Sequence, residues 1–167
     1  SDFIDIVENT YPFYFKKITK EDLDRSKSYK QIASLNVKSK SSSDLDQFLK
    51  GLQPKILIKE VDNNTIERSA QLIAKTNQFK LNSRLFSPKQ LISKKINSLS
   101  ITFKDKFHNY GIISSLVYKI SRTDKSIYIE NWVMSCRVFS RRIEDFIIDY
   151  LITIAKKNNF SKISFDF

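Results

Sequence analysis

The chain has 167 residues, a formal net charge of +11 and only two glycines, Gly51 and Gly111. A soluble chain of this length usually carries about a dozen glycines, and two isolated ones exclude the glycine-rich loops that bind nucleotides. No run of about 18 uncharged apolar residues is present, which excludes a membrane-spanning helix. One cysteine and one histidine exclude an internal disulfide and an ordinary zinc site, so we expect a cytoplasmic protein without a bound metal.

The positive charge is concentrated in the second part of the chain. Residues 55–167 contain 20 basic and 10 acidic side chains, whereas residues 1–54 contain 9 and 8. Residues 68–104 contain eight basic side chains and no acidic one, which predicts a surface that attracts an acidic partner. AT-rich coding explains the same composition without a partner. We do not expect nucleic acid to bind, because no recognised binding motif is present.

Residues 1–54 predict a helical lead-in with too few apolar positions to form a core of its own. A helix is expected over residues 18–35, capped by Thr19. A short helix follows after Ser43, and Gly51 is placed to end it in a left-handed conformation.

Residues 55–167 predict an α/β fold with a mixed sheet flanked by helices. A strand over 55–61 is followed by the turn DNNT, which caps a helix over 66–79. Ser87 caps a second helix over 87–96. Three strands, a long helix and a final strand complete the order, at residues 98–107, 110–120, 126–139, 140–157 and 162–167. The long helix has an apolar stripe that predicts one buried face, formed by Ile143, Phe146, Ile147, Tyr150, Leu151 and Ile154.

Two motifs stand out within this order, KTNQF at residues 75–79 and SCRV at residues 135–138. Together with the lead-in segments EDLDRSKSYK and DLDQFLKGLQ, they resemble the C-terminal part of FkbH-like proteins. In that family a haloacid-dehalogenase-type domain precedes a GNAT-like acyltransferase fold. The resemblance implies that residues 1–54 are a linker from an absent upstream phosphatase-like domain. It also implies that residues 55–167 are a GNAT-like domain, truncated at its C-terminal end.

The family resemblance implies a function in loading acyl carrier proteins. FkbH-like proteins are associated with placing a glyceryl unit on such a carrier for polyketide-type biosynthesis, so this chain would help transfer a glyceryl-type acyl unit. No DxDx[TV] motif is present, and the chain therefore cannot perform the phosphatase-type chemistry itself. The alternative is a noncatalytic GNAT-like module that only docks a carrier protein or a partner domain.

The start of the long helix is a candidate anion site. A helix N-terminus attracts phosphate, and Arg137, Arg141 and Arg142 add positive charge. GNAT proteins bind acyl-CoA pyrophosphate here with a pattern like [QR]-x-x-G-x-[GA]. In this chain Ser140 replaces the first glycine and Arg142 the small last residue, which puts coenzyme A binding in doubt. The ligand is coenzyme A or a phosphopantetheine; the alternative is a solvated helix start with surface arginines.

Cys136 and His108 are the candidate catalytic residues. A thiolate near arginines has a lowered pKa and is a better nucleophile, and the family resemblance implies a thioester on Cys136. The alternative is a buried cysteine in a central strand. His108 is the only histidine and is either a surface turn residue or the base that serves Cys136.

The remaining candidates are polar residues that lie at or after the end of the helix expected over 66–79, or in the strand expected over 126–139. Asn77, Gln78 and Arg84 are candidates to orient a small polyol or pantetheine amides, unless they only satisfy the backbone of their own loop. Glu130 is either a general base or, by default, an exposed strand carboxylate.

Overall fold

The computed structural model describes residues 49–166. The helix expected over residues 18–35 and the caps expected at Thr19 and Ser43 lie outside this range. Residues 49–51 form a helical turn, as expected, but Gly51 does not end it in a left-handed conformation. Gln53 takes that conformation instead, with φ of 49°.

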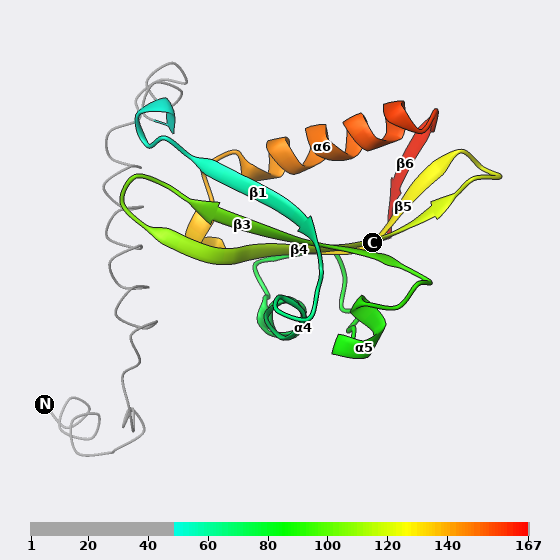
Figure 1. The fold of residues 1–167 in the computed structure, drawn as a ribbon, viewed down its shortest axis with the longest axis horizontal. Helices are drawn as coiled ribbons and strands as arrows, with labels where there is room; N and C mark the ends of the chain where they lie inside the picture. The colour runs from blue at the N-terminus through cyan, green and yellow to red at the C-terminus, as the bar shows by residue number, and fades with distance from the viewer. Residues whose placement is uncertain (1–48, 167) are drawn as a thin grey trace, which may run out of the picture. The chain divides into compact units, whose positions relative to one another are not determined.

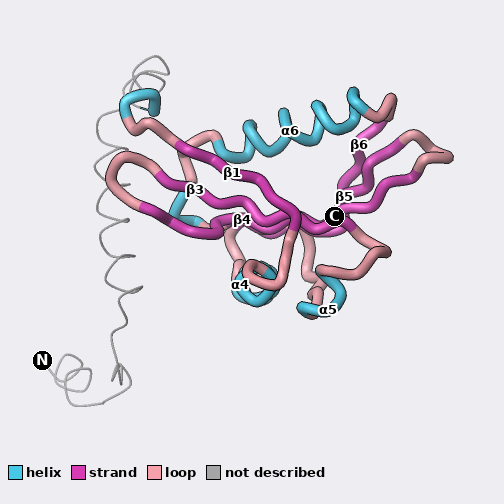
Figure 2. Tube along the Cα trace, viewed as in Figure 1, coloured by secondary structure: helices cyan, strands magenta, loops and turns pink. Residues whose placement is uncertain are grey.

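A six-stranded mixed sheet forms the centre of the described region (Figures 1 and 2). Four strands pair antiparallel in the order β1 (Lys55–Glu60), β3 (Asn97–Lys104), β4 (Asn109–Ser121) and β5 (Ser126–Met134). The outer edge of β5 is shared by two short strands. The parallel strand β6 (Lys162–Phe165) pairs with its first half, and the antiparallel strand β2 (Phe79–Lys80) pairs with its last two residues.

Helices cover both faces of the sheet, which confirms the predicted α/β class. Figure 1 shows α4 (Ile66–Lys75) and α5 (Pro88–Leu91) on one side and α6 (Ile143–Lys157) on the other. Among the described residues, no helix is long and apolar enough to cross a membrane.

The predicted apolar stripe of α6 is largely confirmed, although it is narrower than expected. Ile143, Ile147 and Leu151 have no exposed surface and pack against the sheet. Burying each of these side chains contributes about 1.5–3 kcal/mol. Phe146 is 45% exposed, because its position one residue before Ile147 turns it towards the edge of the buried face.

Tertiary pairing corrects several predicted boundaries. The helix expected over 66–79 ends at Lys75, because Phe79 pairs with Met134 as part of β2. The strand expected over 126–139 ends at Met134, and Cys136–Val138 form a 3₁₀ turn. The second helix is only the single turn of α5.

Candidate functional site

A β-bulge at Glu130 divides β5 into two halves. Val117 pairs with Asn131 and the next residue of β4, Tyr118, pairs with Ile129, so Glu130 is the extra residue of β5. A bulge places two residues opposite one and interrupts the alternation of faces. The strand therefore changes direction at the point where its parallel pairing with β6 stops, after Ile129.

Glu130 is buried, and its prediction as an exposed strand carboxylate was wrong. The residue is 2% exposed, because the bulge turns it under two long cationic side chains. Its Oε1 atom accepts hydrogen bonds from Arg84 Nη1 and Lys119 Nζ, both at 2.8 Å. Oε2 is buried and has no hydrogen-bond partner in the described part of the chain. Arg84, a predicted ligand residue, therefore contacts Glu130, while about half of its side chain stays exposed.

Tyr128 and Asp166 lie beside this charged group. Tyr128 is 36% exposed, and its pKa is raised by desolvation and then by its hydrogen bond to Asp166. The region thus holds both signs of charge beside β5.

Asn82 fills the gap between β5 and β6. Its Nδ2 atom donates to the carbonyl oxygen of Glu130 at 2.9 Å and to that of Asp166 at 2.8 Å. Its Oδ1 atom accepts from the backbone N–H of Arg84 and from Nδ2 of Asn131. These four bonds tie the two diverging strands together through one side chain.

The loop between β5 and α6 has a backbone that normally requires glycine. Ser140 has φ of 64° and Arg142 has φ of 55°. The GNAT pattern has small residues at these two positions. In this chain the left-handed conformation is adopted by the larger residues Ser140 and Arg142. Both side chains are exposed. The N–H groups in the first turn of α6 lack carbonyl partners within the helix and give this end its positive potential.

Arg141 is turned into the protein, whereas Arg142 faces outwards. The side chain of Arg141 is 3% exposed. It donates to the carbonyl oxygen of Arg137 at 2.9 Å and to the hydroxyl of Tyr110 at 2.8 Å. Its Nη2 atom also lies 3.7 Å from the buried carboxylate of Asp105. Arg141 therefore anchors the loop to the β3–β4 hairpin.

Cys136 lies outside the sheet, in the 3₁₀ turn that follows β5. It is partly exposed, so the alternative of a buried cysteine in a central strand was wrong. Ser135 begins the turn, and its hydroxyl accepts from the backbone N–H and from Nε of the neighbouring Arg137. The turn places the thiol side chain at the same end of the sheet as the start of α6.

His108 lies in the turn between β3 and β4, as predicted. Its ring packs edge-on against Tyr110, with 4.7 Å between the ring centroids. Tyr110 contacts Arg141, which in turn contacts Arg137 next to Cys136. A short series of contacts thus links His108 to the cysteine loop.

Asn77 and Gln78 are exposed in the segment that leads from α4 to β2. The antiparallel pairing of Phe79 with Met134 directs this segment towards Ser135, at the beginning of the cysteine loop. Gln78 also lines an apolar hollow of about 420 Å³, together with Trp132 and Phe165. The structure therefore gathers Asn77, Gln78 and the cysteine loop near one end of β5, while Arg84 lies further along it.

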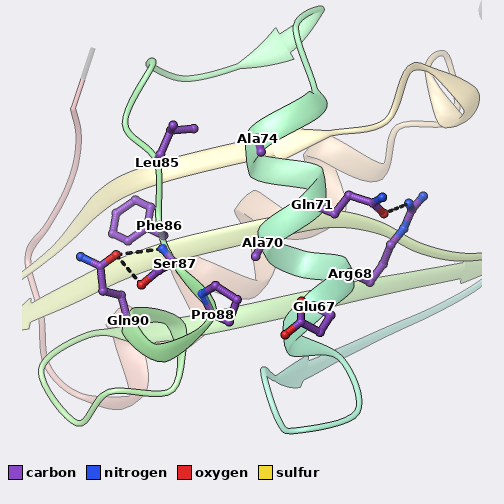
Figure 3. Close-up of a pocket in the computed structure, with 10 residues that line it drawn as sticks. All are labelled: Glu67, Arg68, Ala70, Gln71, Ala74, Leu85, Phe86, Ser87, Pro88 and Gln90. Atoms are coloured by element: carbon purple, nitrogen blue, oxygen red, sulfur yellow. Dashed lines mark hydrogen bonds between the residues drawn. The ribbon is translucent and has the colours of Figure 1, made fainter.

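A larger hollow, of about 910 Å³, separates α4 from the segment leading into α5 (Figure 3). Its lining includes the apolar Ala70 and Ala74 on the α4 side and Phe86 on the opposite side. Leu85 stands at its edge and is 62% exposed. Several exposed lysines of the predicted basic segment belong to this layer, namely Lys75, Lys89, Lys94 and Lys95.

Comparisons with known proteins identify the fold. No protein-family model matches the sequence, and no curated protein sequence matches it significantly. A ribosomal-protein-alanine N-acetyltransferase from Brucella melitensis biovar Abortus 2308 has a similar structure, with a TM-score of 0.52 and 12% identity over 67% of this chain and 80% of that one. A GNAT-family acetyltransferase from Staphylococcus aureus Mu50 gives 0.51 and 14% over 68% and 74%. The chain therefore has the fold of GNAT acetyltransferases.

Coenzyme A does not fit the arrangement of the described residues. The phosphate end would suit the first turn of α6, where the backbone N–H groups and the exposed Arg142 lie. The attached extended arm would then run beside the last residues of β5, since residues 135–142 join the two elements. That edge is already paired with residues 79–82. We therefore derive no reaction step through coenzyme A.

Sequence reasoning did not identify Asn82, Lys119 or the buried position of Glu130. Their importance depends on the bulge and on pairing between segments far apart in the chain. The polar pair Glu130 and Asn131 within an otherwise apolar strand was the one available signal.

Proposed function

We propose that this chain is an acyl-transfer domain that holds a glyceryl-type acyl unit as a thioester on Cys136 and passes it to an acyl carrier protein. The GNAT fold supports acyl transfer in general, and the resemblance to FkbH-like proteins supports the glyceryl unit and the carrier. The observation that carries the proposal is the partly exposed position of Cys136 in the loop before α6.

The transfer is a thioester exchange that needs no oxidant or reductant. The thiol of the carrier protein attacks the carbonyl carbon of the Cys136 thioester, and a new carbon–sulfur bond forms as the bond to Cys136 breaks. The proton lost by the attacking thiol returns to the Cys136 thiolate. His108 is the residue proposed to relay the proton.

The basic layer of α4 and α5 is the proposed docking surface for the carrier. Exposed Lys75, Lys89, Lys94 and Lys95 give it positive charge, which steers an acidic protein and raises its association rate. This steering is screened by salt. Binding of the carrier should therefore weaken strongly between 50 mM and 500 mM salt.

Intact-mass spectrometry tests the covalent role of Cys136. The chain is incubated with a glyceryl thioester of a small thiol and then with a carrier protein bearing phosphopantetheine. The expected result is one glyceryl adduct per chain. Neutral hydroxylamine should release this adduct, and addition of the carrier protein should transfer the glyceryl unit to the carrier. Cys136→Ala should form no adduct, whereas Ser135→Ala serves as the neighbouring control. An adduct that persists in Cys136→Ala refutes the proposal.

A second candidate is a noncatalytic module that only docks the carrier or an upstream haloacid-dehalogenase-type domain. The closed outer edge of β5 favours it, because the part of the fold that would hold an extended arm is occupied by the chain itself. Calorimetry and intact-mass spectrometry together separate the candidates: a noncatalytic module binds the carrier protein in calorimetry but forms no adduct with the glyceryl thioester in mass spectrometry.

A further inference from the structure

The outer edge of β5 beyond Ile129 has the properties of a site for an extended ligand. The parallel partner β6 pairs only with Ser126–Ile129, so the remaining backbone groups of β5 need other partners. An extended molecule that carries amide groups can add to such an edge as a strand does. The positive N-terminal end of α6 follows shortly after this edge and suits a phosphate at the end of that molecule.

The chain itself occupies this edge. Phe79 and Lys80 pair antiparallel with Met134 and Val133. The backbone N–H of Leu81 then donates to the carbonyl oxygen of Trp132 at 2.9 Å. The short segment 79–82 therefore uses the backbone positions of β5 that a ligand arm would use.

Asn82 completes the closure at the point where the two parallel strands part. Each N–H of a primary amide can serve one acceptor. Here one acceptor is the carbonyl oxygen of Glu130 in β5, and the other is that of Asp166, directly after β6. The oxygen of the same side chain accepts from Arg84 and Asn131. No other standard side chain of this length offers both donors and an acceptor, so this position specifies asparagine.

We infer that residues 79–82 act as a built-in strand that closes the ligand edge of β5, with Asn82 as its latch. Coenzyme A can bind along β5 only when the segment leaves. Its apparent affinity is then reduced by the fraction of molecules in which the edge is open. The inference is independent of the proposed role of Cys136, because it concerns access to the edge and not the formation of a thioester.

Calorimetric titration with coenzyme A tests the inference on the whole chain. Asn82→Ala removes all four hydrogen bonds of the side chain, and about tenfold or more tighter binding than in the wild type is expected. Asn63→Ala is the matched control, since Asn63 is exposed in the turn before α4 and should leave the affinity unchanged. Equal binding by the wild type and Asn82→Ala overturns the inference, and so does the absence of binding by both.

Hydrogen exchange gives a second readout that needs no variant. The amide of Leu81 should exchange slowly in the free wild-type protein, because it is bonded to Trp132. An excess of coenzyme A should accelerate its exchange by releasing the segment. Fast exchange in the free protein overturns the inference, as does unchanged protection of Leu81 in a protein saturated with coenzyme A.

Discussion

Replacing Arg141 by methionine removes the side chain that holds the cysteine loop to the β3–β4 hairpin. The guanidinium group donates to the Arg137 carbonyl and to the Tyr110 hydroxyl, and it faces the carboxylate of Asp105, whose side chain is only 2% exposed. Its guanidinium carbon also lies 5.0 Å from the centre of the Tyr110 ring. The methionine variant would leave the carboxylate buried without its counter-charge.

Removing one partner of a buried ion pair lowers the free energy of unfolding by about 3–5 kcal/mol. A domain of this size has a free energy of unfolding of about 5–15 kcal/mol, so Arg141→Met should lose a large part of its stability. The melting temperature should fall by about 10 °C or more. Urea unfolding followed by circular dichroism measures the loss. Arg122→Ala, an exposed arginine in the β4–β5 turn, should change stability by less than about 0.5 kcal/mol.

A double variant isolates the charge effect. Asp105 Oδ1 accepts from the backbone N–H groups of Phe107 and His108, and the amide oxygen of asparagine can keep these bonds. Asp105→Asn in the Arg141→Met background should therefore recover about 1–3 kcal/mol. A loss of less than about 1 kcal/mol in Arg141→Met would show that Arg141 does not anchor the loop.

Three further predictions concern other elements of the site. Glu130→Gln should lower the free energy of unfolding by about 1–3 kcal/mol in urea titrations, because Oε1 no longer receives two charged donors as a carboxylate; an unchanged midpoint would contradict this. The hydrogen bond from the Thr65 hydroxyl, and then those from the backbone N–H groups of Asn64 and Thr65, lower the pKa of Asp62. The Asp62 carboxylate therefore stabilises the fold at pH values above the pKa that Asp62 has in the unfolded chain. This stabilisation is lost as the pH falls through the lowered pKa of the folded state. Asp62→Ala should thus destabilise the protein at pH 7 but hardly at pH 2. Ser140→Val should cost about 1–2 kcal/mol, since a β-branched residue resists a φ of 64°, whereas Ser140→Gly should be neutral or slightly stabilising in the same assay.

Local patterns were sufficient for the elements whose signals are confined to one segment. The spacing of Ile143, Ile147 and Leu151 predicts α6 and its buried face, and the structure confirms both. The DNNT turn predicts the start of α4, and Asp62 accepts the hydrogen bonds that begin this helix. These features depend on residues within a few positions of one another, so a periodicity or a capping motif is enough to identify them.

Other features depend on partners that no local pattern reveals. Phe79 reads as a helical residue but belongs to β2, because Met134 offers it a strand edge. Glu130 reads as an exposed strand residue but is buried, because a bulge turns it beneath Arg84 and Lys119. Arg141 and Arg142 look equivalent in the sequence, yet one is buried and the other exposed.

The sequence alone determined the order of the helices and strands apart from β2, the concentration of positive charge and the unusual residues at the start of α6. The resemblance to the GNAT pattern already indicated that Ser140 and Arg142 stand where a GNAT protein has small residues. Only the tertiary structure showed that both adopt the left-handed backbone, and that residues 79–82 close the edge of β5. Backbone hydrogen bonds between strands carry no side-chain signature. Such a closure therefore becomes visible only when distant segments are brought together in space.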